Sequence, residues 1–273
     1  MKEKAAIIVS SKDPAGINIK ENLLKFFEET GETFEGSKIY KKGNLKLYTT
    51  KKDSILSENI DKKIDAGFFL FATKHQSAAG KESFTVHSIG NFGDAKYGGK
   101  NKELVQTNPN LVKELINKLK NKAKGTNHEI TIEATHHGPY MEKPCTFIEI
   151  GSNKKSWENK DYGKIIAETI TEVFDIPINQ YKTFIVLGGS HYNHIANKIL
   201  LETDYTIGHI CPKHQLQNLD YNLLKQMKEK SNSDEVILDW KGLSQNKRDV
   251  IKLLEKTKTN YKKSKELFNK DSV

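Results

Sequence analysis

Seven apolar runs, rich in β-branched and aromatic residues, recur along the chain and predict strands. They cover residues 5–10, 67–73, 84–91, 129–135, 145–151, 183–189 and 235–240. Near-continuous apolar runs, as opposed to strict alternation, are typical of strands in a sheet that is covered on both faces. The pattern therefore predicts an α/β fold with a mixed, mostly buried central sheet flanked by helices.

Helical spacing of apolar residues fills the intervals between these runs. One predicted helix begins after Asp13-Pro14, a capping residue followed by a proline suited to the first turn, and runs to Gly31. The other predicted helices cover residues 108–125, 162–174 and 220–230, with a lysine-rich helix at about 247–270. Because the sequence contains no internal repeat or low-complexity linker, we expect residues 1–273 to form a single domain.

Composition favours an anionic partner. The 44 Lys and Arg residues outnumber the 35 Asp and Glu residues, which gives a formal net charge of +9. A positive field attracts polyanions such as RNA without specifying them, although an A/T-rich genome that encodes lysine freely would produce the same excess. No apolar run approaches the roughly 20 residues of a membrane helix, and the amino terminus lacks a secretory signal. We therefore expect a cytoplasmic protein with no membrane partner.

Histidines follow three of the predicted strands directly. These residues are His75, His136, His137 and His191. In open α/β sheets, ligands bind beyond the carboxyl ends of the strands, where loops converge. We therefore expect the four side chains to share one crevice, with His87 as a further candidate.

Imidazole and carboxylate groups together suit hydrolysis assisted by a metal ion or a general base. Neutral imidazole is a common zinc ligand, and a carboxylate can orient the water that zinc activates. Glu133 and Glu149 are the candidate carboxylates. Glu133 lies three residues before His136, an odd offset that would put the two on opposite faces of a strand unless the chain turns first. The alternative is that the histidines only hydrogen-bond the ends of a buried sheet.

Two loops have further candidate roles. Gly188 and Gly189 permit backbone amides to face an anion, or equally a tight turn. Ser190 beside His191 suggests a nucleophile and its base, but adjacent residues rarely reach the required geometry. The segment 90–103, rich in Gly and Asn, is the longest irregular piece, and such loops are often functional.

Five motifs, "TVHSIGN", "EATHHGP", "FIEIGS", "LGGSHY" and "LDWKG", follow one another along the chain. Through these motifs the chain resembles the archaeal-type D-aminoacyl-tRNA deacylases, from about residue 67 to 243. The resemblance implies hydrolysis of the ester between a D-amino acid and the terminal ribose of tRNA. It also implies zinc dependence, with one ion or two, a monomer, and a fold similar to phosphorylases and peptidyl-tRNA hydrolases.

The residues and the resemblance together define three candidate sets. The catalytic candidates are His75, His87, Glu133, Glu149 and His191. The predicted metal ligands are His136, His137 and His191. The predicted substrate-binding residues are Gly138, Gly188, Gly189, Tyr192 and Lys213.

Some alternatives remain open at this stage. The family often has a Pro-Arg pair after "HY", whereas this chain has Asn193-His194, which puts the tRNA contact of that loop in doubt. Cys211 and His214 have metal-like spacing, but without a second pair we expect them to be structural. A nucleoside phosphorylase-like enzyme, another small-molecule hydrolase and a non-enzymatic RNA-binding protein are the alternative functions, because one fold supports several activities.

Overall fold

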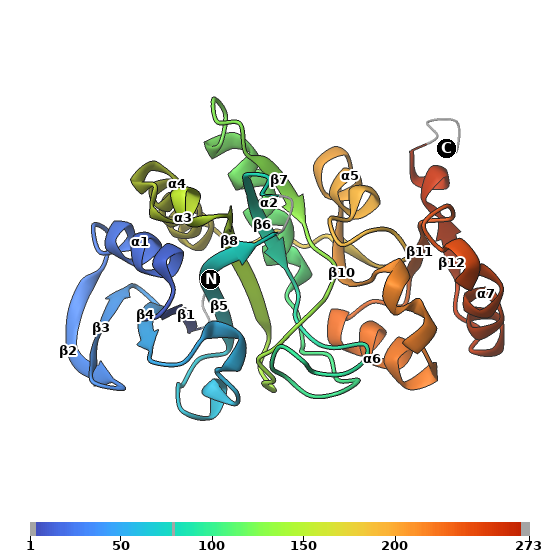
Figure 1. Ribbon diagram of the computed structural model, residues 1–273, viewed down its shortest axis with the longest axis horizontal. Helices are drawn as coiled ribbons and strands as arrows, with labels where there is room; N and C mark the ends of the chain where they lie inside the picture. The colour runs from blue at the N-terminus through green and yellow to red at the C-terminus, as the bar shows by residue number, and fades with distance from the viewer. Residues whose placement is uncertain (1–3, 78–79, 269–273) are drawn as a thin grey trace.

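The computed structural model describes residues 4–77 and 80–268, which form two β-sheets side by side with helices packed against them (Figure 1). In spatial order, the larger sheet contains β2 (Glu28–Phe34), β3 (Ser37–Lys42), β4 (Leu45–Thr50), β1 (Ala5–Ser10), β5 (Phe68–Gln76), β8 (Cys145–Ser152), β6 (Ser83–His87) and β7 (Glu129–Ile132). The smaller, parallel sheet contains β10 (Tyr205–Cys211), β9 (Lys182–Leu187), β11 (Val236–Leu238) and β12 (Tyr261–Lys263). This arrangement confirms the predicted α/β class with a mixed sheet.

Helices cover one face of the larger sheet. They are α1 (Pro14–Leu23), α2 (Pro109–Lys122), α3 (Lys154–Glu158) and α4 (Lys160–Asp175). Figure 1 shows α1, α3 and α4 together on one side of this sheet. Asp13 caps α1 by accepting a hydrogen bond from the Gly16 amide at 2.9 Å. Ile7, Leu70 and Ile148, which point from alternate strand positions toward these helices, belong to the main core.

The remaining helices surround the smaller sheet. They are α5 (His194–Glu202), α6 (Tyr221–Ser231) and α7 (Lys247–Lys256). Short 3-10 turns cover Ser54–Leu56, Ile60–Lys62, Lys213–Asn218, Ser244–Asn246 and Ser264–Leu267. Within residues 4–77 and 80–268, no helix combines the length and apolar character that crossing a membrane requires.

The other face of the larger sheet is divided between apolar packing and polar side chains. Phe71 of β5 stacks on Phe147 of β8, with ring centroids 4.7 Å apart. His75 and Glu149 follow these rings at even spacings along the same strands, and His87 of β6 pairs directly with Phe147. Because alternate residues of a strand share a face, all three polar side chains project from the phenylalanine face.

One strand direction differs from the expectation. β6 pairs with β8 in antiparallel register, and β7 runs parallel to β6. The carboxyl ends of β6 and β7 therefore point away from those of β5 and β8. The prediction that the histidines lie beyond one common set of strand ends is wrong for β6 and β7, and the polar cluster instead lies across the face of the sheet.

The predicted helix from Asp13 to Gly31 is wrong in its second half. α1 ends at Leu23, and β2 begins at Glu28. β2 is a mostly exposed edge strand, so no buried apolar pattern marks it, and its main-chain hydrogen bonds to β3 decide its conformation. The hairpin strands β3 and β4 were likewise not predicted.

The predicted lysine-rich helix at 247–270 is also too long. α7 ends at Lys256, and Lys258, with a φ of +52°, adopts the left-handed conformation that commonly ends helices. The chain then forms β12, which pairs with β11. Residues 269 and 270 of the predicted helix lie outside the described residues. The single-domain organisation of 1–273 stays a prediction.

Candidate active site

A crevice of about 940 Å³ lies against the polar part of the larger sheet. Its lining includes His75, His136, His137, His191 and Glu149. Segments that are distant in the sequence therefore bring together the four histidines that were expected to share a crevice, and this spatial prediction is confirmed.

Ile132, the last residue of β7, faces the main core, so strand alternation turns Glu133 to the opposite face, beside His87. The segment after β7 then pairs with the segment after β9, since the Ala134 amide donates to the carbonyl of His191 at 2.8 Å. Strand alternation no longer separates Glu133 from His136, whose Nε2 lies 3.5 Å from the Glu133 carboxylate.

The Glu133 side chain is fully buried between imidazoles. Its Oε2 accepts a hydrogen bond from Nε2 of His191 at 2.8 Å, and its Oε1 lies 3.1 Å from Nδ1 of His75. Burial raises the pKa of Glu133, but the hydrogen bond from His191 and the nearby histidine charges lower it by more. Because Nε2 of His191 donates to Glu133, Nδ1 is the nitrogen of this partly exposed ring that is left to accept a proton.

His75 links both carboxylates. Its Nδ1 lies 3.3 Å from Glu149 as well as 3.1 Å from Glu133, and its Nε2 lies 2.7 Å from the hydroxyl of Tyr192. Burial lowers the pKa of His75, but the hydrogen bond to Glu149 and the two carboxylate charges outweigh burial and raise it. Burial raises the pKa of Glu149, but the interactions with His75 and His87 lower it by more than burial raises it. The Glu149 carboxylate is therefore ionised at neutral pH.

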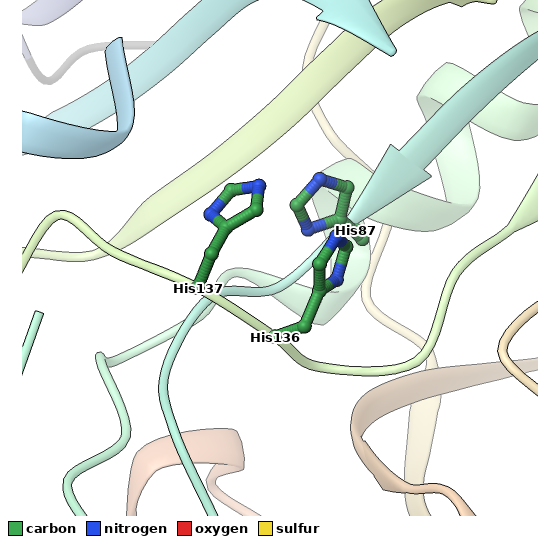
Figure 2. A group of neighbouring side chains, drawn as sticks. All are labelled: His87, His136 and His137. Atoms are coloured by element: carbon green, nitrogen blue, oxygen red, sulfur yellow. The ribbon is translucent and has the colours of Figure 1, made fainter. Parts of the chain in front are cut away.

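A second group consists of His87, His136 and His137, one ligand atom from each lying within 4.8 Å of the others. Figure 2 shows the three rings gathered together, His87 from the end of β6 and the other two from the segment after β7. Each Nδ1 lies beside a backbone carbonyl: Ser88 for His87 at 3.2 Å, Ala134 for His136 at 2.7 Å and Gly138 for His137 at 2.6 Å. A carbonyl only accepts, so each Nδ1 carries a proton and donates it, which leaves Nε2 to bind a metal.

The electrostatics of His136 and His137 also suit metal binding, since both rings are kept neutral. Burial lowers the pKa of His136 well below its ordinary value, and burial together with the charge of His87 lowers that of His137 to about 4. Burial lowers the pKa of His87, but its interaction with Glu149 outweighs burial and raises it. Nε2 of His87 is buried without a hydrogen-bond partner among the described residues, 3.7 Å from the Glu149 carboxylate. A cation is therefore favoured beside this nitrogen.

Imidazole nitrogen and carboxylate oxygen are the donors that zinc prefers. Besides the three-histidine group, two further close sets occur among the described residues: Glu133 with His136 and His191, and His75 with Glu133 and Glu149. The predicted metal set of His136, His137 and His191 is not one of these groups, because it is divided between two of them that share His136. His87, which was predicted to be catalytic, is the third member of the all-histidine group.

The two glycines after β9 form a tight turn and make backbone hydrogen bonds. Gly188 donates its amide hydrogen to the carbonyl of Cys211 at 2.9 Å, and Gly189 donates to Gly242 at 3.2 Å. Their φ values of +102° and +86° are accessible to glycine without strain. Both amides are therefore engaged in the turn, and neither glycine is part of the crevice lining.

Of the other candidate residues, some contact the crevice or its histidine cluster and others do not. Tyr192 reaches the cluster through its hydroxyl, whereas Lys213 is exposed and is not part of the crevice lining. The Ser190 hydroxyl donates to the Tyr192 carbonyl at 2.5 Å, which leaves no serine–histidine pair with His191. Cys211 is a buried free thiol, and His214 lines the crevice.

Sequence reasoning gave no site role to any residue of segment 90–103, although it marked this segment as a candidate functional loop. Gly90–Asp94, Lys96 and Tyr97 line the crevice. The loop lies tightly against the histidine segment, since a Cβ atom on Gly138 would lie 2.3 Å from the backbone nitrogen of Gly99. Gly138 therefore permits a close backbone contact. An aromatic residue inside a glycine-rich loop is the sequence signal that would have found Tyr97.

The fold and the site together define an α/β protein with a carboxylate–histidine cluster in a solvent-reachable crevice, a constellation suited to hydrolysis. A family model described as D-aminoacyl-tRNA deacylase matches residues 62–262. The chain therefore belongs to the D-aminoacyl-tRNA deacylase family, as its motifs predicted.

Individual relatives agree with this membership. The chain is 36% identical to the D-aminoacyl-tRNA deacylase of Thermococcus onnurineus, with 91% of this chain and 95% of that protein covered. It is 33% identical to the D-aminoacyl-tRNA deacylase of Methanosarcina acetivorans, with 98% and 94% covered. A crystal structure described as a conserved protein of unknown function is similar to it with a TM-score of 0.90, at 31% identity and 97% coverage of each chain.

Proposed function

We propose that the protein hydrolyses the ester bond between a D-amino acid and the terminal ribose of tRNA, which releases the free amino acid and tRNA. The observation that carries this proposal is the pair of buried Glu133 and partly exposed His191, which lies beside the three-histidine group at an open crevice. The substrate class comes from the family, whose relatives are named for this activity.

His191 is the proposed general base. Its Nδ1 takes a proton from the attacking water, while Glu133 orients the ring through Nε2 and stabilises the imidazolium that forms. His75 contributes positive charge between Glu133 and Glu149, which keeps both buried carboxylates ionised. An aminoacyl ester is already activated, so positioning water and stabilising the developing oxyanion are the main requirements.

Zinc is the proposed cofactor, and Nε2 of His87, His136 and His137 would hold one ion. The fit rests on the donor set and on the buried Nε2 of His87, which has no other partner among the described residues. When bound, zinc would polarise the ester carbonyl and lower the pKa of a nearby water. With the ion on these three histidines, His191 remains free to act as the base.

The proposed partner is tRNA, and the net charge of +9 supports a polyanionic substrate. The monomeric state is a proposal that follows from the resemblance to the family, and the cytoplasmic location stays a proposal from the sequence. The lysine-rich surface would attract the tRNA body through its phosphates.

The test is release of tyrosine from matched D- and L-tyrosyl-tRNA, with and without a chelator. We expect hydrolysis of the D-ester only, loss of activity on chelation and recovery with zinc. His191→Gln should reduce the rate roughly 100-fold through loss of the general base. His194→Gln, which changes an exposed histidine three residues further on, is the matched control and should be fully active.

The outcomes separate the parts of the proposal. Hydrolysis of both esters, or of neither, would contradict the deacylase function. Chelator-insensitive hydrolysis of the D-ester would remove zinc from the mechanism and leave the function in place. Phosphate-dependent cleavage of nucleosides in a parallel incubation would favour the phosphorylase-like alternative.

A further inference from the structure

Tyr97 is exposed to an unusual degree for a residue of the crevice. Its side chain is 70% exposed, yet it contributes to the crevice lining beside His136 and His137. Within the described ranges 4–77 and 80–268, no aromatic ring stacks on it. A large ring whose faces are open to solvent at the mouth of a crevice can receive a planar ligand.

Hydrogen bonds to neighbouring segments hold the backbone at Tyr97. Its carbonyl accepts a hydrogen bond from the Gly138 amide at 3.0 Å, directly after the metal-binding candidate His137. The carbonyl of the next residue, Gly98, accepts from the side chain of Asn91 at 2.9 Å. The backbone of Tyr97 is therefore held in a fixed position next to the histidine segment.

Glu58 fixes the same loop from the other side. Its Oε1 accepts the amide hydrogen of Gly99 at 2.6 Å, and its Oε2 accepts that of Tyr140 at 2.6 Å. One carboxylate thus ties the Tyr97 loop to the segment that follows His137. A contact surface that is already ordered loses little conformational entropy when it binds a ligand.

We propose that Tyr97 is the platform on which the terminal adenine of the tRNA 3′ end stacks, an inference that rests on the proposed function. Single-stranded RNA ends are commonly held by stacking of unpaired bases on aromatic side chains. The bond from Gly138 to Tyr97 puts the platform next to the histidine segment. A nucleoside on this ring would have its ribose ester directed toward the cluster.

The base is a better occupant than the amino acid for two reasons. The ester carbonyl must reach His191, which is less exposed than Tyr97 and is hydrogen-bonded to the buried Glu133, so the reacting end of the substrate lies deeper in the crevice than the ring of Tyr97. Ammonium groups are also available to the phosphates, because Lys96 and Lys74 line the same crevice, together with Asp53 and Asp94. Ammonium groups near a stacked base suit the adjoining phosphates.

The test compares Tyr97→Ala with Tyr97→Phe and a matched control. We expect Tyr97→Ala to lower kcat/KM for D-tyrosyl-tRNA roughly tenfold, mainly through KM, because the stacking surface is lost. Tyr97→Phe keeps the ring and should stay within about twofold of the wild type. Tyr221→Ala removes a ring of similar exposure, 64%, from a separate cavity at α6, and should change nothing.

Two further arms identify the occupant. D-alanyl-tRNA should lose as much activity as D-tyrosyl-tRNA in Tyr97→Ala. A loss confined to the tyrosyl ester would show that the amino acid contacts Tyr97 and would overturn the proposal.

The last arm is calorimetric binding of AMP and ribose 5-phosphate, without turnover. We expect the wild type to bind AMP more tightly, and Tyr97→Ala to abolish the difference. Equal binding of both ligands by the wild type would also overturn the platform. If the wild type shows this AMP preference but hydrolyses no D-aminoacyl-tRNA, the proposed function fails while the adenine site stands.

Discussion

Glu133 is an ionised carboxylate whose side chain has no exposed surface and three imidazoles around it. A buried charge is stable only where partners replace the lost water. The charge of Glu133 therefore draws His75, His136 and His191 toward one point. Removing it should disturb the orientation of the site more than the packing of the core.

We predict that Glu133→Gln lowers deacylation roughly 100-fold, because the neutral amide no longer stabilises the imidazolium of His191. The melting temperature should fall, since the neutral amide leaves the buried positive charge of His75 with one carboxylate partner fewer. Initial rates and thermal melts check both statements. Glu129→Gln, in the same strand β7 but paired with Lys81 at the surface, should be active. Full activity of Glu133→Gln would contradict the proposed role.

At the scale of elements, β10 supports the segment that carries His136. Nε2 of His209 donates to the carbonyl of Val105 at 2.9 Å, and Nδ1 accepts from the hydroxyl of Thr135 at 3.0 Å. His209 is completely buried, and burial lowers its pKa to about 3. A neutral imidazole thus joins β10 to the end of the β7 segment.

This pKa predicts a pH dependence of folding. An unfolded histidine titrates near about 6.5, so below that pH the unfolded chain binds a proton that folded His209 does not. Stability therefore falls as the pH falls below about 6.5. The free energy of unfolding, measured with denaturant, should fall between about pH 6 and pH 5 in the wild type. This fall should be smaller by about 1 kcal/mol per pH unit in His209→Gln. His194→Gln is the control, and an unchanged slope in His209→Gln would refute the assignment.

Two of the strands that sequence reasoning missed, β2 and β12, share a cause. β2 is mostly exposed, β12 has three residues, and the pairing of each with a neighbour fixes its conformation. Local apolar periodicity cannot report hydrogen bonds to a distant strand. By contrast, α2 and α4 have strong amphipathic patterns, and the sequence predicted them well.

At the scale of the whole molecule, the net charge of +9 makes binding of a polyanion sensitive to salt. We predict that KM for D-tyrosyl-tRNA rises at least about tenfold between about 50 and 200 mM salt, because counterions compete for the phosphates. The value of kcat should stay nearly constant, since the reacting ester lies inside the crevice. Steady-state kinetics at a series of salt concentrations measures both, and a KM independent of salt would argue against electrostatic capture of tRNA.

The candidate site was readable from the sequence only in part. Four of its histidines were recognisable because an apolar run ends one or two residues before each of them, which is a local feature of the sequence. They are His75, His136, His137 and His191. The direction of Glu133 was not readable, because it depends on which face of β7 packs against the main core. The grouping of His87 with His136 depends on the position of β6 beside β7, a contact between segments far apart in the chain.

The sequence by itself determined the residue types, the main buried strands and helices, the net charge and the motifs of the family, because these are local properties of the chain. The tertiary structure decided which strands pair and in which direction, and therefore which face of the sheet holds the cluster. It also decided the carbonyl partner of each Nδ1, and with it which nitrogen of each ring can bind a metal. Such choices follow from long-range packing and hydrogen bonding, which no local pattern encodes.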